Sequence, residues 1–302
     1  MGRLLPEDEP GRLTVRRGQF HDVVVGSDRV VCLPRTGAAA ARLPEREARL
    51  RVLAGVDLGF RTPEPVGRGV DRDAAVAAAD ADADADADAV GGGGSGGGVP
   101  YLVLGRIPGE PLAADAVGDV GMAEAVARQY AALLGGLVRA GADGAVRAVL
   151  PQEPEGRWRR FAEGVRAELF GLMSERGRLR AERELAALDE LPRTGAADVA
   201  VVHGDLGAEN VLWEWERGLP RLVGVLDWDD VALGDQAEDL AAVGASYGDE
   251  LLARVLALSG PPDAGRLARI AAIRGTFALQ QALWGMRDGD EAELADGLAG
   301  YR

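Results

Sequence analysis

The sequence predicts an α+β protein of two lobes, a small β-sheet lobe with one helix followed by a larger, mainly helical lobe. Short runs rich in β-branched residues occupy the beginning of the chain, whereas apolar residues at helical spacing dominate after the segment 105–111. A chain of 302 residues is also longer than the usual single domain. We therefore place the two lobes at residues 1–104 and 105–302.

The β-like runs are RLTVRR, DVVVG and RVVCLP, separated by Gly18 and by the turn residues 26–28. They predict a small antiparallel sheet. The next segment, LPEREARLRVLA, has Leu43 and Leu50 at helical spacing, with Glu47 on the same face. The later segment PYLVLGRIPGEPL predicts one more buried strand that ends at a Gly/Pro-rich connection.

Residues 71–99 interrupt this lobe with alternating Asp and Ala followed by a Gly/Ser run. Alternating Asp and Ala cannot bury an apolar face, and Gly/Ser runs have high chain entropy. We interpret the segment as a flexible insert. Calcium binding is the alternative, although nothing in the repeat orients the carboxylates.

The second lobe contains several helical stripes of apolar residues. In RWRRFAEGVRAELFGLM the stripe consists of Trp158, Phe161, Val165, Leu169 and Leu172. Such a stripe is typical of a helix face packed against a core.

The composition excludes several classes of function. The net charge is -15 and the chain has no lysine, which argues against nucleic acid as a partner, although solubility alone also explains the charge. Cys32 is the sole cysteine, so an internal disulfide and a multi-cysteine metal site are excluded. No apolar run is long enough to span a bilayer and the first residues do not resemble a secretory signal, so we expect no membrane partner and a cytoplasmic location.

The stretch VVHGDLGAENVLW places Asp205 and Asn210 just before a β-like run. A turn at Arg217-Gly218 leads into a second run that ends at Asp227, so a hairpin would bring Asn210 and Asp227 together. Oxygen ligands from an Asp and an Asn suit Mg²⁺, and Asp205 could accept a hydroxyl proton. The structural alternative is that all three are turn and cap residues.

This set matches the phosphoryl-transfer arrangement of protein kinases. The stretches HGDLGAENVL and GVLDWDDVALGDQAEDLA resemble the two signatures of the aminoglycoside phosphotransferase family in particular. The resemblance implies a protein-kinase-like fold that binds ATP or GTP as phosphate donor. It makes Asp205 the catalytic residue and Asn210 and Asp227 the Mg²⁺ ligands.

The resemblance extends more weakly over most of the chain. RVVCLPRT looks like the third strand, and YLVLGRIPGEPL looks like the hinge that receives the nucleotide base, which implies contacts at Gly105 and Ile107. In the family pattern the loop histidine organises the site, so His203 is expected to be a scaffold residue and Asp239 a brace for the loop. Asp235 resembles a helix N-cap.

Two features depart from the family. Many relatives have a lysine or arginine at the position of Cys32, and this chain has no lysine. Our hypothesis is that Arg35 pairs with Glu47 and reaches the phosphates. The expected glycine-rich loop, RRGQFHDVVV, has one glycine and reads equally well as an ordinary hairpin. A nucleotide-binding pseudokinase therefore stays an alternative.

The resemblance also implies that the acceptor is a small molecule with a hydroxyl group. The resemblance favours an aminoglycoside or macrolide antibiotic, and hence a role in antibiotic resistance, whereas choline, fructosamine and homoserine kinases are alternatives from the same family. Candidate acceptor-binding residues are Asp229, Trp284 and Asp288. The acids from Asp288 onward also fit a solvated helix face.

Overall fold

The computed structural model describes residues 5, 8–9, 13–18, 21–71, 98–189, 199–260 and 264–302. Contacts divide the chain into two compact units. The first comprises Met1–Asp57, Arg61–Gly109 and Val223–Leu226, and the second Leu58–Phe60, Glu110–Leu222 and Asp227–Arg302. The predicted insert at 71–99 lies outside the described residues except at its two ends.

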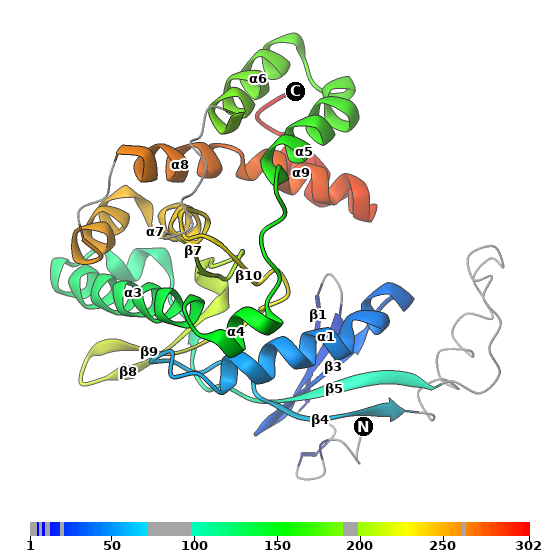
Figure 1. Cartoon of the computed structure of the whole chain (residues 1–302), viewed down its shortest axis with the longest axis vertical. Helices are drawn as coiled ribbons and strands as arrows, with labels where there is room; N and C mark the ends of the chain where they lie inside the picture. The colour runs from blue at the N-terminus through cyan, green and yellow to red at the C-terminus, as the bar shows by residue number, and fades with distance from the viewer. Residues whose placement is uncertain are drawn as a thin grey trace. The chain divides into compact units, whose positions relative to one another are not determined.

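The first unit is built on an antiparallel sheet with the strand order β1-β2-β3-β5-β4 (Figure 1). Each neighbouring pair in this order runs antiparallel. The predicted small sheet ahead of a mainly helical part is confirmed. Its strands are β1 Thr14–Arg17, β2 His21–Val25, β3 Arg29–Pro34, β4 Pro65–Asp71 and β5 Val99–Gly105.

Strand β4 is a finding of the structure, because its sequence PVGRGVD lacks the run of β-branched residues that identifies the other strands. Its glycines make room for neighbours on β5. A Cβ atom built on Gly69 would lie 2.4 Å from the hydroxyl oxygen of Tyr101. Small residues here allow close pairing with β5, and they also hide the strand from a propensity argument.

Helix α1, Gly37–Ala54, begins six residues before the segment predicted from the sequence. The Thr36 side chain accepts a hydrogen bond from the Ala39 N–H at 3.1 Å and so caps the helix, and an alanine run forms its first turns. Pro44 therefore lies inside the helix rather than in its first turn. Buried Leu43, Leu50 and Leu53 face the core.

The second unit is mainly helical. Helix α3 packs against α7 and strand β7, and a Cβ atom on Gly141 of α3 would lie only 2.8 Å from the Cα atom of Ala200. None of the helices in the described ranges combines the length and apolar character needed to cross a membrane. The longer helices are α3 Val120–Gly141, α4 Gly144–Val149, α5 Arg157–Gly164, α6 Glu175–Asp189, α7 Ala237–Leu258, α8 Ala264–Gly275, α9 Phe277–Asp288 and α10 Glu291–Gly297.

Short strands accompany these helices. β7 pairs antiparallel with β10, and β8 lies between β6 and β9. The contact grouping assigns Val223–Leu226, which includes the end of β9, to the first unit. The strands are β6 Glu110–Pro111, β7 Val199–Val202, β8 Val211–Glu216, β9 Leu219–Val225 and β10 Ala232–Asp235.

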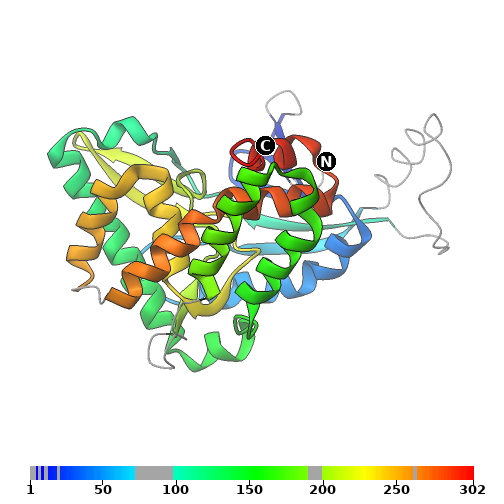
Figure 2. The same ribbon diagram turned by 90° about the horizontal axis from the view of Figure 1, so that it is seen from above.

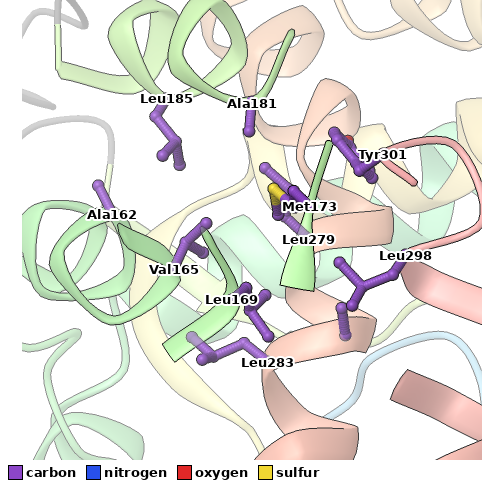
Figure 3. Close-up of a cluster of buried hydrophobic side chains, with 11 residues drawn as sticks. Ala162, Val165, Leu169, Met173, Ala181, Leu185, Leu279, Leu283, Leu298 and Tyr301 are labelled. Atoms are coloured by element: carbon purple, nitrogen blue, oxygen red, sulfur yellow. The ribbon is translucent and has the colours of Figure 1, made fainter. Parts of the chain in front are cut away.

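Another hydrophobic core lies among α5, α6 and α9. Figure 2 shows these helices from above, with α5 and α6 in green and α9 in orange to red. The predicted stripe supplies Val165 and Leu169, which follow α5, to this core, whereas Leu172 is 44% exposed. A π-turn at Val165–Leu169 and a 3-10 turn at Phe170–Leu172 change the helical period between them. The core residues, most of them labelled in Figure 3, are Ala162, Val165, Leu169, Met173, Ala181, Leu185, Leu279, Ala282, Leu283, Leu298 and Tyr301.

Candidate active site

A fully buried carboxylate, that of Asp239, binds the backbone of the loop after β7. Asp239, near the start of α7, accepts the backbone N–H of His203 at 3.0 Å and that of Gly204 at 3.1 Å. Burial raises the pKa of Asp239 to about 7, while these two hydrogen bonds act in the opposite direction. Asp239 therefore fixes the path of the loop that carries Asp205.

His203 is an acceptor inside this loop. Its Nδ1 atom accepts the backbone N–H of Asp205 at 3.2 Å, so that nitrogen carries no proton. The ring is fully buried and lies edge-on to Trp228, with centroids 4.6 Å apart, and Trp228 stacks in turn on Phe60. These contacts give His203 an organising position rather than that of a free base.

Gly204 has a backbone conformation that side chains rarely adopt, with φ of 88°. A Cβ atom there would lie 2.9 Å from both the Cβ atom and the carbonyl oxygen of Asp230. The glycine between His203 and Asp205 is thus required by backbone geometry and by the close approach of the segment after β9.

Asp205 and Asn210 are joined directly. The Asn210 Nδ2 atom donates to the Asp205 carboxylate and to its backbone oxygen, both at 2.9 Å. A 3-10 turn, Ala208–Asn210, brings the amide back to the loop, and the Ala208 N–H donates to the Ser246 hydroxyl at 3.0 Å. Because the amide nitrogen is engaged, the Asn210 side-chain oxygen is the atom left to bind a cation.

The hairpin predicted after Asn210 is formed by β8 and β9. Its turn residues Arg217 and Gly218 both have positive φ, 52° and 81°, which is the type I′ geometry of a two-residue hairpin. The Arg221 guanidinium pairs with Glu214 across the two strands at 3.0 Å. Asp227 follows β9 and itself has φ of 54°.

The charges around Asp205 are mainly negative. Asp205 as a whole is exposed, but its carboxylate is partly buried. This burial raises the pKa of Asp205 to about 6, and the nearby charges of Glu209, Asp227 and Asp230 act in the same direction. The hydrogen bond from Asn210 lowers the pKa. A divalent cation would relieve this repulsion. Within the described ranges no cluster of three or more His, Cys, Asp or Glu is arranged to hold a metal, so phosphate oxygens and water would have to complete a set begun by Asn210 and Asp227.

The structure corrects the predicted pairing of Arg35 with Glu47. The Glu47 carboxylate contacts Arg51 at 2.7 Å and Arg68 at 3.2 Å. Arg35 instead donates to the Gly18 carbonyl at 2.8 Å, and its Nε atom lies 4.0 Å from the Asp22 carboxylate. The reason is strand β4, which places an arginine where the sequence showed no strand.

The predicted hinge residues lie at the end of β5. The Gly105 N–H donates to the Glu64 carbonyl at 2.8 Å, and the Arg106 N–H donates to the Asp28 carbonyl at 2.9 Å. A nucleotide base would therefore need other backbone groups of this segment. Ile107, the second predicted residue, is buried. Of the predicted phosphate-loop tip, residues 19–20 lie outside the described residues.

The predicted acceptor residues form two groups. Asp229 lies in the segment after Asp227, whereas Trp284 and Asp288 lie one turn apart on α9, with Trp284 55% exposed. Among the acids that follow, Asp290 caps α10 by accepting the N–H groups of Ala292 and Glu293. The Asp290 carboxylate therefore stabilises the start of α10.

Sequence reasoning missed two features of this region. The first is the charge of Glu209, which helps to raise the pKa of Asp205. Its position directly before Asn210 in the loop motif was the signal that could have revealed it. The second is a partly buried ion pair in which Arg157 donates to both carboxylate oxygens of the buried Glu238, at 2.7 and 2.5 Å. Because the partners are 81 residues apart, no local pattern reveals the pair.

Comparison with known proteins now identifies the family. Residues 14–295 match the phosphotransferase enzyme family. The chain belongs to this family. It is a phosphotransferase, as the two sequence motifs indicate.

The relatives of this phosphotransferase cover its whole length. It is 59% identical over 302 residues to viomycin phosphotransferase of Streptomyces vinaceus. The alignment covers 100% of this chain and 96% of the relative. The GDP complex of aminoglycoside 2'-phosphotransferase-IIIa has a TM-score of 0.75 at 20% identity, covering 99% of this chain and 93% of that one. The streptomycin–ATP complex of APH(2")-IIa has a TM-score of 0.64 at 15% identity, covering 99% and 92%. The structural likenesses confirm the protein-kinase-like fold of this phosphotransferase.

Proposed function

We propose that this phosphotransferase moves the γ-phosphate of ATP or GTP to a hydroxyl group of viomycin or a closely related antibiotic. The observation that carries the proposal is the 59% identity to viomycin phosphotransferase along the entire chain. The GDP and ATP complexes of proteins with the same fold support a nucleotide donor. The acceptor expected from the sequence alone was an aminoglycoside or macrolide, and both classes belong in the test. A cytoplasmic location, where the donor is available, is part of the same proposal.

Asp205 is the group that would receive or orient the acceptor hydroxyl. A hydrogen bond from Asn210 holds its carboxylate, and its raised pKa of about 6 lets it accept a proton more readily than an ordinary aspartate. His203 and Asp239 would act through the backbone of the loop rather than on the substrate. Most of the rate enhancement then comes from alignment and electrostatics.

Asn210 and Asp227 are the residues that would hold Mg²⁺. The remaining side-chain oxygen of Asn210 and the carboxylate of Asp227 are hard ligands, and the negative charge around Asp205 favours a cation there. When bound, the ion supplies charge neutralisation for the phosphates. Asp229 and the exposed Trp284 with Asp288 are the groups we propose for contact with the acceptor.

The direct test offers the purified protein ATP and GTP separately, with viomycin, an aminoglycoside, a macrolide and choline as acceptors. We expect one phosphoryl group to be added to viomycin in the presence of Mg²⁺, detected by the mass of the product. Asp205→Asn is the control. Transfer to another acceptor, with none to viomycin, would contradict the acceptor and leave the reaction class in place.

A pseudokinase is the second candidate, because buried Cys32 occupies the position where many relatives carry a phosphate-binding cation. It predicts a thermal shift with nucleotide but no phosphoryl transfer across the acceptor panel. Phosphorylated product from any acceptor, lost in Asp205→Asn, excludes it.

A further inference from the structure

One row of residues crosses the sheet of the first unit, with one residue from each strand. Neighbouring strands pair Arg16 with Val23, Val23 with Cys32, Cys32 with Leu102, and Leu102 with Arg68. Directly opposed residues of antiparallel strands have their side chains on the same face. Cys32 therefore shares a face with Arg68, which lies two strands away.

This face is the one that α1 covers, because Arg68 reaches Glu47 of α1. Cys32 is 2% exposed, and Leu102, which lies between Cys32 and Arg68 in the row, is 0% exposed. Two strand spacings separate positions 32 and 68, roughly 10 Å between the backbones. The side chain of Arg68 thus lies over the same helix-facing surface that a cation at position 32 would occupy.

Glu47 has two partners with different positions. Its Oε1 atom faces Arg51, one turn later on the same helix, whereas its Oε2 atom faces Arg68 on strand β4 at 3.2 Å. Arg51 therefore neutralises Glu47 within α1, and Arg68 joins Glu47 to the sheet. In kinases an ion pair between a sheet cation and a helix glutamate positions the phosphates of the nucleotide.

Arg68 can bind an anion while it stays paired. The contact with Glu47 uses the Nη1 atom, and a guanidinium has five N–H donors. The side chain is 44% exposed, whereas the Glu47 side chain is 15% exposed. A largely buried carboxylate that orients a more exposed guanidinium is suited to present the remaining donors to phosphate oxygens.

We propose that Arg68 binds the phosphates of the nucleotide donor and that Glu47 orients it, so that the cation has moved from the third strand to β4. This inference rests on the proposed nucleotide-dependent reaction, but not on the identity of the acceptor. It replaces Arg35, whose guanidinium is bound to the β1–β2 hairpin through the Gly18 carbonyl.

The test compares Arg68→Ala with Arg51→Ala and Arg35→Ala by calorimetric titration without any acceptor. Each variant is titrated with the triphosphate that the wild type binds, in the presence of Mg²⁺, and with the corresponding nucleoside. Loss of a phosphate contact weakens only the triphosphate, by about 10- to 100-fold for a charged hydrogen bond. Arg51→Ala is the matched control, because it removes the other partner of Glu47.

We expect Arg68→Ala to lose triphosphate affinity while nucleoside affinity stays unchanged, and Arg51→Ala and Arg35→Ala to stay within threefold of the wild type, roughly the scale of an exposed pair. Equal losses for nucleoside and triphosphate in Arg68→Ala would make Arg68 structural and overturn the proposal. Unchanged triphosphate affinity in that variant, or a selective loss in Arg35→Ala alone, would overturn it as well. Absence of transfer to viomycin, with these affinities as expected, would count against the acceptor only.

Two further variants keep the test decisive if Arg68→Ala folds poorly. Arg68→Lys keeps the charge and should retain most of the triphosphate affinity. Adding Cys32→Lys to Arg68→Ala returns a cation to the third strand and should recover the affinity that Arg68→Ala loses. Weakening by Arg68→Lys as large as by Arg68→Ala, together with no recovery in the double variant, contradicts the assignment. Circular dichroism melting curves show which variants are folded.

Discussion

The loop that carries Asp205 and the sheet that carries Arg68 hold their charged residues in different ways. Asp205 and Asn210 are five residues apart and bond to each other directly. Glu47 and Arg68 come from a helix and from a strand that interacts with it only in the folded sheet. The comparison shows that a site built within a short loop keeps its motif in the sequence, whereas a cation shared across strands can move without leaving a local pattern.

The largest expected effect tests the loop. Asp205→Asn removes the carboxylate that we propose accepts or orients the hydroxyl proton, while keeping the size of the side chain. We expect the turnover number for viomycin to fall by roughly 10²- to 10⁴-fold, measured by product formation under saturating nucleotide and Mg²⁺. Nucleotide affinity should change little. Turnover within threefold of the wild type would show that Asp205 takes no part in the chemistry. The loop motif would then have predicted its functional residue no better than the sequence of the sheet does.

The prediction of the fold succeeded where local patterns are strong. Strands β1, β2, β3 and β5 are β-branched runs, and the Arg217-Gly218 pair marks the hairpin turn. Strand β4 was missed because Gly69 serves the packing of Tyr101, which is a tertiary requirement. The start of α1 was missed because Pro44 lies inside the helix.

The candidate site divides in the same way. The three residues Asp205, Asn210 and Asp227 are visible in two contiguous motifs, and the structure brings Asn210 to Asp205. The partners of Glu47 could not be read from the sequence, because Arg68 lies on the strand that the sequence hides. Arg35 was chosen for its nearness along the chain, which does not measure distance across a sheet.

The next largest effect contrasts the Arg157–Glu238 ion pair of the second unit, whose carboxylate is buried, with the more exposed Arg51–Glu47 pair of the first. Burial raises the pKa of Glu238, and Arg157 opposes that shift. Arg157→Met leaves the buried Glu238 carboxylate without this partner, so we expect the free energy of unfolding at pH 8 to fall by about 1–3 kcal/mol, less than for a fully buried pair because the Arg157 side chain is 35% exposed. Urea denaturation measures the change. Because Glu238 can then take up a proton, the loss should be smaller at pH 5.

The matched control is Arg51→Ala, which removes a partner of Glu47 one helical turn away. Because Arg51 is 58% exposed and Glu47 keeps Arg68 as a second partner, we expect a loss of about 0.3–0.5 kcal/mol, the scale of a pair one helical turn apart. Equal losses in Arg157→Met and Arg51→Ala would show that the two units do not differ in how they stabilise their charges.

The pH dependence of the reaction gives a smaller effect. With a pKa of about 6, Asp205 is ionised above pH 6 and protonated below it. We therefore expect kcat/KM to fall as the pH drops through about 6. Bound Mg²⁺ would move this fall to a lower pH. Glu209→Gln removes one of the negative charges that raise this pKa. We expect the acidic limb of the profile to move to lower pH. An unmoved limb would mean that the charge of Glu209 does not reach Asp205.

The smallest effect concerns the turn that joins β8 to β9. Arg217 has φ of 52°, a conformation that costs an ordinary side chain about 1–2 kcal/mol and that asparagine adopts more readily. Arg217→Asn creates the preferred Asn-Gly turn, so we expect the free energy of unfolding to rise by about 0.5–1 kcal/mol in urea denaturation. The turnover number should not change, because the turn lies at the opposite end of the hairpin from Asn210 and Asp227. A loss of turnover would show that the substitution shifted the register of β8 and β9, and the loop site would then depend on pairing across strands as the sheet site does.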